Sequence, residues 1–171
     1  MEDLKKLTKL EHSHTVNYYS VWMENEECIY IQMEFCETNL RNVIADNVLI
    51  FQNQESNQVM KTIEFFISCE IIKEILKGLK SLHNSEPAII HGNLNSHNVL
   101  ITYSNVGKSF VKLGGFGLAK YKYAYEITMV DKDQAKHIAP EVILDDMNDV
   151  KSDVYSLGVI CKDLFGNLKQ T

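Results

Sequence analysis

The sequence predicts an α+β fold from three observations. Two runs rich in aromatic and β-branched residues, 16–22 and 28–35, flank an acidic turn and predict a β-hairpin. The stretch 62–83 repeats apolar residues at helical spacing and predicts a long helix. The stretch 152–165 is apolar almost all round and predicts a buried helix. We find no internal repeat and no domain boundary, so the hairpin and the helices are expected to share one core.

Composition and charge narrow the class of protein. The chain of 171 residues is 45% hydrophobic and 23% charged, which is ordinary for a globular domain. Its net charge of -6 argues against binding to a nucleic-acid backbone, which needs a basic face. No stretch of the sequence approaches the length of about 18 consecutive apolar residues that indicates a membrane span. Neither a nucleic acid nor a membrane is therefore an expected partner.

The cysteines and the N-terminus favour a cytoplasmic protein. Cys28, Cys36, Cys69 and Cys161 are widely spaced and form no C-x-x-C pair, which disfavours a zinc site. Free buried thiols are typical of a reducing compartment. The charged N-terminus lacks the apolar segment of a signal peptide. We expect a cytoplasmic location, and a nuclear one stays open.

Shorter elements are expected near the hairpin. Leucines at three-residue steps suggest a short helix over 3–11. Either Thr38 or Asn39 is expected to cap a short helix that begins at the next residues. The stretch 47–60 is rich in Gln and Asn and is expected to be an exposed loop.

The second half of the chain alternates short strands and helices. The apolar face of the long helix comprises Ile67, Ile71, Ile72, Ile75, Leu76, Leu79 and Leu82, and so wide a face implies a central helix packed on several sides. Two short strands, 98–101 and 110–113, follow. The segment 120–138 is polar and aperiodic, and Pro140 fits the first turn of a short helix.

Four motifs in this order make the chain resemble the eukaryotic protein kinase domain. They are HGNLNSHN (91–98), KLGGFGLAK (112–120), IAPE (138–141) and KSDVYSLGVI (151–160). The resemblance implies a single partial kinase-like domain over 1–171. Its residues 36–171 would form a mainly helical large lobe that lacks its last helices. Residues 1–35 would be a remnant of the small lobe, with one helix and a β-hairpin. The stretch 30–44, YIQMEFCETNLRNVI, looks most similar to the kinases that phosphorylate the alpha subunit of translation initiation factor two.

The resemblance implies packing roles for several residues. Asp153 would accept backbone N–H bonds from the loop 91–98, and His91 would brace Phe116, which is followed by Gly117 in the metal motif. Two further sets are implied: Leu7 and Tyr18 would complete a stack with Phe116 and His91, while Leu40, Leu100, Ile160 and Leu164 would form a second stack. Glu141 resembles a Glu that pairs with an Arg further along the domain, and no counterpart of that region follows here.

The groups that carry the chemistry of a kinase differ in this chain. Asn93 stands where the resemblance implies a catalytic Asp, and a carboxamide cannot act as a general base near neutral pH. Gly115 stands where it implies the metal-binding Asp, although magnesium prefers carboxylate and phosphate oxygens. Gly92 and Asn95 replace an implied Arg and Lys. Asn98 keeps the second metal position as a weak candidate ligand, and no counterpart of the phosphate-pairing Lys is found.

A nucleotide site is a weak expectation on the same resemblance. The Glu34 carbonyl and the Cys36 amide would hydrogen-bond an adenine, and Leu100 would support its ring. The other interpretation, which we favour, is that 34–36 is a plain connector. No cofactor is therefore expected, and ATP with magnesium is needed only if the chain is an active kinase.

Three functions remain open at this point. The first is a catalytically impaired kinase-like module, a pseudokinase, that binds a protein partner. It would do so through the exposed face that carries the helix and the hairpin of residues 1–35. That partner would be a true kinase, of the translation-control type. The second is a segment of a divergent Ser/Thr kinase that transfers phosphate from ATP to protein. The third is a degenerate gene product with no settled function.

Overall fold

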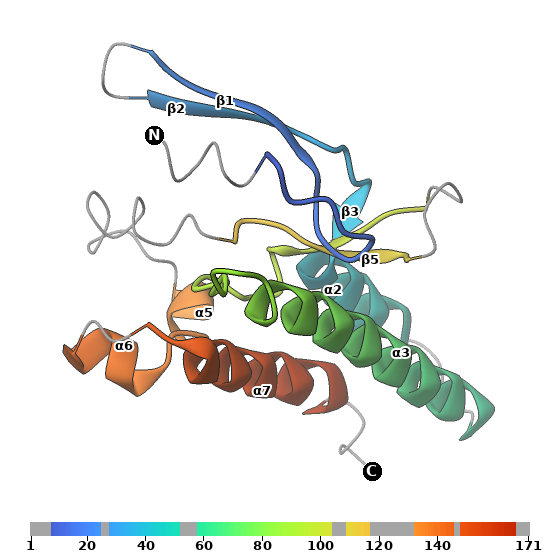
Figure 1. Ribbon diagram of the computed structural model, residues 1–171. Coiled ribbons are helices and arrows are strands. Elements are labelled where there is room, and N and C mark those ends of the chain that lie inside the picture. The colour runs from blue at the N-terminus through green and yellow to red at the C-terminus, as the bar shows by residue number, and fades with distance from the viewer. Residues whose placement is uncertain are drawn as a thin grey trace.

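The computed structural model describes residues 8–24, 28–51, 58–103, 109–116, 132–145 and 148–166, and their arrangement is the predicted α+β fold. A hairpin of β1 (Tyr18–Glu24) and β2 (Cys28–Met33) stands apart from the helices (Figure 1). A three-stranded sheet lies between the hairpin and the helices, with the order β3 (Thr38–Asn39), β4 (Val99–Ile101) and β5 (Val111–Leu113). The helices are α2 (Leu40–Phe51), α3 (Gln58–His83), α5 (Lys132–Ala135), α6 (Pro140–Asp145) and α7 (Val150–Gly166).

The hairpin predicted over 16–22 and 28–35 is confirmed. Its two strands pair antiparallel, from Tyr18 opposite Met33 to Glu24 opposite Cys28. Trp22 and Tyr30 face each other across the strands, and their rings stack with centroids 5.4 Å apart. Several large apolar side chains on and next to the hairpin are exposed: Tyr19, Trp22, Met23, Tyr30, Met33 and Phe35.

The segment before the hairpin joins it to the three-stranded sheet. Val16 N–H donates to the Leu113 carbonyl at 2.9 Å, and Leu113 N–H donates to the His14 carbonyl at 2.8 Å. Thr15 therefore lies parallel to β5 as a single bridge. Because Thr15, Val16 and Leu113 are fully buried, this junction is part of the core.

The short helix after Asn39 is confirmed, and its length is corrected. The Asn39 side chain caps α2, since its Oδ1 accepts the Asn42 N–H at 3.0 Å. The loop expected over 47–60 is wrong at both ends, because α2 continues to Phe51 and α3 already begins at Gln58. Gln is a good helix former and Asn disfavours a helix only moderately, so a local composition of this kind does not end a helix. The helix expected over 3–11 falls mostly outside the described residues, and 8–9 form a turn.

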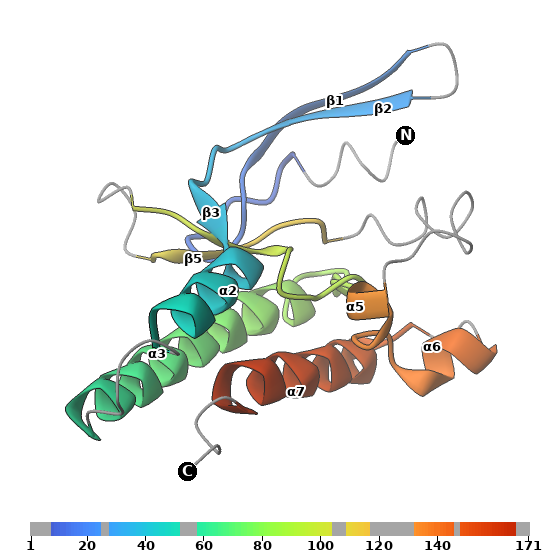
Figure 2. The same ribbon diagram turned by 180° about the vertical axis from the view of Figure 1, so that it is seen from behind.

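The helices bury one face each, which is less than the sequence suggested. In α3, Ile71, Ile75, Leu79 and Leu82 are buried, whereas Ile67 is 51% exposed and Leu76 is 50% exposed. In α7, the prediction of burial all round is wrong, because Val154 is 60% exposed. The reason is visible in Figure 2: α7 lies beside α3 on one side, and no described element covers its other side.

The shorter elements of the second half of the chain can be compared with the expectation in the same way. The strands at 98–101 and 110–113 are β4 and β5, and Pro140 is the first residue of α6, as predicted. The four-residue helix α5 lies within the segment expected to be aperiodic. None of the described helices is both long and apolar enough to span a bilayer.

Candidate functional site

The loop 91–98 is suspended from the first turn of α7 by one carboxylate. Asp153 is 1% exposed, and its two oxygens accept the backbone N–H groups of His91 and Gly92, each at 2.8 Å. The ring of His83, at the end of α3, donates to the same carboxylate at 2.7 Å. The N-terminal end of a helix favours a negative charge. Asp153 therefore has the loop-holding role that the sequence implied, and His83 is a partner that sequence reasoning missed.

Glycine accommodates an unusual backbone angle in this loop. Gly92 has φ of 70°, in the left-handed region where a side chain is unfavourable. Gly92, which stands where the resemblance implies an arginine, therefore lets the backbone adopt this angle without strain at the point where the loop passes Asp153.

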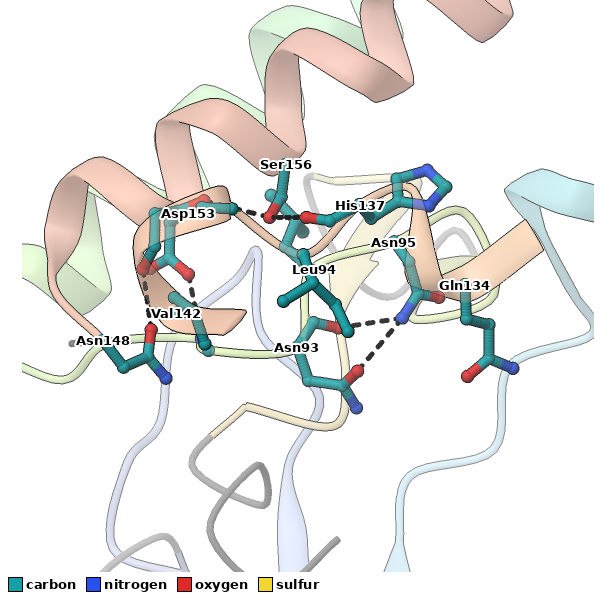
Figure 3. Close-up of a pocket in the computed structure, with 13 residues that line it drawn as sticks. Asn93, Leu94, Asn95, Gln134, His137, Val142, Asn148, Asp153 and Ser156 are labelled. Carbon is teal, nitrogen blue, oxygen red and sulfur yellow. Dashed lines mark hydrogen bonds between the residues drawn. The ribbon is translucent and has the colours of Figure 1, made fainter. Parts of the chain in front are cut away.

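Three asparagine side chains hold the rest of the loop. The Asn93 carbonyl accepts the side-chain N–H groups of Asn98 at 2.7 Å and Asn95 at 3.1 Å. Asn95 Oδ1 in turn accepts the backbone N–H groups of His97 and Asn98, at 3.0 and 3.3 Å. The Asn93 side chain also takes part, because its Oδ1 accepts from Asn95 Nδ2 at 3.2 Å (Figure 3). The part of the loop from 93 to 98 is therefore held by amide groups, whereas its start is held by the Asp153 carboxylate.

The two positions implied for metal binding come together in space. Pairing of β4 with β5 places Gly114 against Asn98, whose carbonyl accepts the Gly114 N–H at 2.9 Å. A Cβ built on Gly115 would lie 3.0 Å from Asn98 Cγ, so these two residues are in direct contact. Gly115 itself has φ of 73° and offers no side-chain ligand. The described residues hold no cluster of three His, Cys, Asp or Glu side chains. Of the implied metal ligands, only the neutral Asn98 oxygen is left.

Phe116 is fully buried in the aromatic stack that the sequence implied. Its ring lies 5.1 Å from that of Tyr18 and 6.2 Å from that of His91, centroid to centroid. The Tyr18 hydroxyl also accepts the Gly115 N–H at 2.8 Å, a bond that links the hairpin to the 114–116 segment. No sequence pattern signals this bond, because it depends on where β1 begins in space. The other implied members, Leu7 and Gly117, lie outside the described residues.

Burial sets the protonation of this stack. Desolvation lowers the pKa of His91 to about 4, although the nearby Asp153 charge opposes the shift. The ring is therefore neutral at physiological pH, and its Nδ1 accepts the Asn93 N–H at 3.3 Å. Desolvation likewise raises the pKa of Tyr18 to about 12, so the hydroxyl stays protonated. Neither group is placed to accept a proton from a substrate near neutral pH.

Of the candidate nucleotide residues, Leu100 lies on the middle strand β4, and Glu34 and Cys36 lie in the segment between β2 and β3. Leu100 pairs across the strands with Lys112, and Lys112 Nζ reaches Glu34 Oε2 at 3.0 Å. The Glu34 N–H donates to the Asn17 carbonyl at 2.8 Å. Cys36 is partly buried, and burial together with the Glu34 charge raises the pKa of its thiol. The backbone–backbone hydrogen bonds of the described residues include none to the Glu34 carbonyl and none from the Cys36 amide.

The remaining implied residues fall into two groups. Leu40 and Ile160 are fully buried, and Leu100 and Leu164 pack against the same core, as the second stack requires. Glu141 lies in the first turn of α6, half-buried, and forms no ion pair with a described residue.

A cavity of about 20 Å³, the size of one water molecule, lies beside Asn93 and Asp153 between the loop and α5, α6 and α7 (Figure 3).

Comparison with known proteins agrees with this geometry. The family model described as protein tyrosine and serine/threonine kinase matches residues 1–171. The chain is 29% identical to the mitosis inhibitor protein kinase SWE1 of Saccharomyces cerevisiae over 156 residues. These aligned residues are 91% of the chain and 17% of that protein. It is 29% identical to the mitosis inhibitor protein kinase wee1 of Schizosaccharomyces pombe, over 92% of the chain and 16% of that protein.

A plant relative has a similar sequence identity. The probable serine/threonine-protein kinase WNK6 of Oryza sativa subsp. japonica is 30% identical over 159 residues, which are 92% of the chain and 32% of that protein. The chain thus spans between about a sixth and a third of the length of these curated relatives.

Proposed function

Since the chain belongs to the protein tyrosine and serine/threonine kinase family, we propose that it is a catalytically impaired member that acts by binding. The observation that carries the proposal is the amide network of Asn93, Asn95 and Asn98 in the loop 91–98. The loop is fully built and anchored, yet neither 89–101 nor 110–120 contains an Asp or Glu.

The chemical cost of these replacements is large. Kinases work by positioning the nucleotide and neutralising its charge, with an Asp that accepts the substrate proton. Loss of a general base lowers the rate by about 10²–10⁴-fold. Gly115 removes a carboxylate from the metal site, and magnesium binds weakly to a single amide oxygen. Because each loss alone slows transfer, the two together leave little phosphoryl transfer to observe.

The hairpin supplies the binding surface in this proposal. Exposed aromatic and apolar groups on and beside it are more than scattered single residues, and such patches mark interaction sites. The partner we propose is a catalytically complete protein kinase. The likeness of 30–44 to kinases of translation initiation factor two favours one of the translation-control type. The four free cysteines fit a reducing compartment, so we place this function in the cytoplasm.

A radiolabelled phosphate-transfer assay tests the catalytic half of the proposal. We expect the wild-type chain, with ATP and magnesium, to incorporate no more label than heat-denatured protein. Asn93→Asp with Gly115→Asp serves as the comparison that restores both acids, and Asn84→Asp, on an exposed turn, controls for one of the two added charges. The proposal would be overturned if the wild type transferred label and the Asn98→Ala variant transferred less.

The binding half is tested separately by affinity capture with a purified translation-control kinase. We expect Trp22→Ser to weaken capture, because it removes the stacked pair near the turn end of the hairpin. Tyr103→Ser, at a residue that is also exposed but lies outside the hairpin, is the matched control. Equal capture of both variants would count against the hairpin as the binding surface.

One observation favours the alternative of an active segment. Asn98 donates its amide N–H to the Asn93 carbonyl, which leaves its Oδ1 free to approach a cation. In that alternative the chain needs ATP and magnesium, with Glu34, Cys36 and Leu100 at the adenine. A rise in melting temperature with ATP and magnesium, abolished by Asn98→Ala, would support it.

A further inference from the structure

The turn that precedes the hairpin segment carries two histidines, two positions apart. The rings of His12 and His14 lie 5.3 Å from each other, centroid to centroid. The His12 carbonyl accepts the Thr15 N–H at 3.2 Å and closes the turn. The His14 carbonyl accepts the Leu113 N–H at 2.8 Å, which connects the turn to β5. The bond between Leu113 and His14 therefore depends on the backbone conformation of the turn 12–15.

The His12 side chain forms a hydrogen bond within this turn. Its Nδ1 accepts the backbone N–H of His14 at 3.2 Å. An imidazole nitrogen accepts a hydrogen bond only while it carries no proton, so this bond requires the neutral ring with its proton on Nε2. When His12 takes up a second proton, Nδ1 becomes a donor and faces another donor. The hydrogen bond is then replaced by repulsion between two N–H groups.

The surroundings of the His12 ring disfavour its protonation. Burial lowers the pKa of His12, and the nearby His14 ring and Lys112 ammonium lower it further. Glu34 pairs with Lys112 at 3.0 Å and balances part of that charge. Because the folded-state pKa lies below the usual 6.5, stability that is present above pH 6.5 is lost as the pH falls through the folded value. The ring is only partly buried, so we expect the loss to be local and moderate.

The charges near the second ring act in the opposite direction. His14 Nε2 lies 3.4 Å from Oε1 of the buried Glu74 on α3, and the same oxygen is bonded to Lys77 at 3.0 Å. A proton on His14 is attracted by this carboxylate. The other ring nitrogen lies 2.8 Å from the Ser13 hydroxyl, which can donate or accept, so this bond is kept in both charge states. Protonation of His14 thus favours the turn, whereas protonation of His12 disfavours it.

We propose that the turn 12–15 is an acid-sensitive connection, in which a proton on His12 breaks its bond to the His14 N–H and weakens the attachment of this turn to β5. The acceptor nitrogen lies inside the turn that orients the His14 carbonyl, so loss of the first bond affects the second. The Tyr18 hydroxyl bond to Gly115 does not involve either histidine and keeps the hairpin attached. The inference holds whether or not the hairpin binds a partner protein.

Hydrogen exchange of single amides, measured by NMR from pH 7 to pH 5, tests the proposal. Each rate is corrected for the intrinsic exchange rate at that pH and expressed as a protection factor. The protection factor of the Leu113 amide is expected to fall about two- to tenfold more than those of the Ile75 and Leu79 amides of α3. The α3 amides are the internal reference, because their side chains are buried in the core.

Three variants show which ring is responsible. In His12→Asn, the side-chain oxygen can accept the N–H two residues on and does not titrate, so the protein should keep its protection at pH 7 and lose the additional fall in acid. His12→Ala has no acceptor and should give low protection of the Leu113 amide at both pH values. His14→Gln removes only the second ring and should keep the additional fall. Circular dichroism of each variant separates a lost bond from a lost fold.

The nitrogen chemical shifts of the wild-type ring give a second measurement that needs no variant. They should show the Nε2–H tautomer of His12 at pH 7 and a titration midpoint below 6.5. The Nδ1–H tautomer would overturn the proposal. So would an additional fall that persists in His12→Asn or disappears in His14→Gln, because the second ring would then be the titrating group. An equal fall for the Leu113 and α3 amides would also overturn it, since the turn would then open only with the whole core.

Discussion

Asp153 lies in the first turn of α7 and accepts hydrogen bonds from two backbone amides and one histidine ring. Hydrogen bonds to a charged group contribute about 1.5–3 kcal/mol each, roughly twice the value for neutral pairs. A single buried carboxylate thus fixes the course of the loop 91–93 relative to two helices. The residue that shapes the loop takes no part in the chemistry that a kinase loop performs.

Asp153→Asn should destabilise the protein by about 3 kcal/mol. The amide keeps one acceptor oxygen, but its NH₂ group then faces a backbone N–H that also donates. Urea unfolding followed by circular dichroism measures the change. Asp46→Asn, on the exposed side of α2, is the control and should stay within about 0.5 kcal/mol of the wild type. A loss no larger than the control's would show that the three bonds contribute nothing.

Tyr18→Phe should lower the free energy of unfolding by about 1–3 kcal/mol, because the Gly115 N–H then loses its hydrogen-bond acceptor in a mostly buried environment. Hydrogen exchange at the Gly115 amide, read by NMR, should accelerate together with the loss. Tyr19→Phe is a matched control, since Tyr19 is 60% exposed. Unchanged exchange at Gly115 in Tyr18→Phe would contradict the role of the hydroxyl.

His91 should make the protein less stable as the pH falls. Its folded pKa of about 4 lies below the unfolded value of 6.5, so only the unfolded state takes up this proton between the two. Stability that is present above pH 6.5 is therefore lost as the pH falls toward 4, by at most about 3 kcal/mol. Unfolding measured from pH 7 to 5 stays above the range in which Glu74, whose pKa is lowered, takes up its proton.

The variant His91→Phe isolates this contribution. Its unfolding free energy should fall less steeply with acid than that of the wild type. The pKa of His12 is also lowered, mainly by burial, but it acts equally in both proteins. Identical slopes in His91→Phe and the wild type would mean that the buried ring titrates normally.

At this scale the motifs predicted the packing residues and missed the connections among them. Asp153, His91 and Phe116 occupy the places that the resemblance implied. The Tyr18 hydroxyl bond, the His83 ring and the Asn95 side chain were not predicted. Each depends on the relative placement of segments far apart in the sequence, which a local pattern does not encode.

Two helical glycines show how neighbouring elements constrain a helix. A Cβ on Gly78 of α3 would lie 2.8 Å from Leu113 Cδ1 and 3.1 Å from the His14 carbonyl. A Cβ on Gly158 of α7 would meet nothing within 4 Å. The first glycine lets α3 approach β5 and the segment before the hairpin, and the second has no such packing role among the described residues.

Alanine substitutions at these positions should therefore change stability in opposite directions. Gly158→Ala should stabilise by about 0.5–1 kcal/mol, because glycine loses more backbone entropy in a helix. Gly78→Ala should destabilise by about 1–3 kcal/mol through overpacking. Thermal unfolding of the two variants measures both effects. Stabilisation by Gly78→Ala would mean that α3 is free to move away from β5.

The elements were predicted well where their periodicity is strong. The hairpin, α3 and α7 carry long apolar patterns, and all three were found close to their expected bounds. The two-residue strand β3 and the four-residue α5 are too short to leave a pattern. The burial of α7 was overestimated because an apolar sequence does not reveal which neighbours are there to cover it.

On the scale of the whole molecule, the hairpin is attached to the rest at its base. β1 and β2 pair with each other and with no other described strand. Tyr18 and the segment 14–16 connect the hairpin to the core, whereas its far end bears Trp22 and Tyr30 on the surface. Elements with few buried contacts open at lower free energy than the core.

Hydrogen exchange should reveal this difference. Amides of β1 and β2 beyond Tyr18 should exchange through openings of lower free energy than amides of β4, β5 and α3. Mass spectrometry over a series of exchange times gives the two values in one experiment. The same opening free energy in both regions would show that the hairpin unfolds only together with the core.

Asp153 has one more consequence, for what the shape of this loop reveals. Its bonds go to the backbone N–H groups of His91 and Gly92 and to the His83 ring, so they do not involve the side chains at positions 93, 95 and 115. The outline of the loop therefore does not by itself reveal which side chains stand at these three positions.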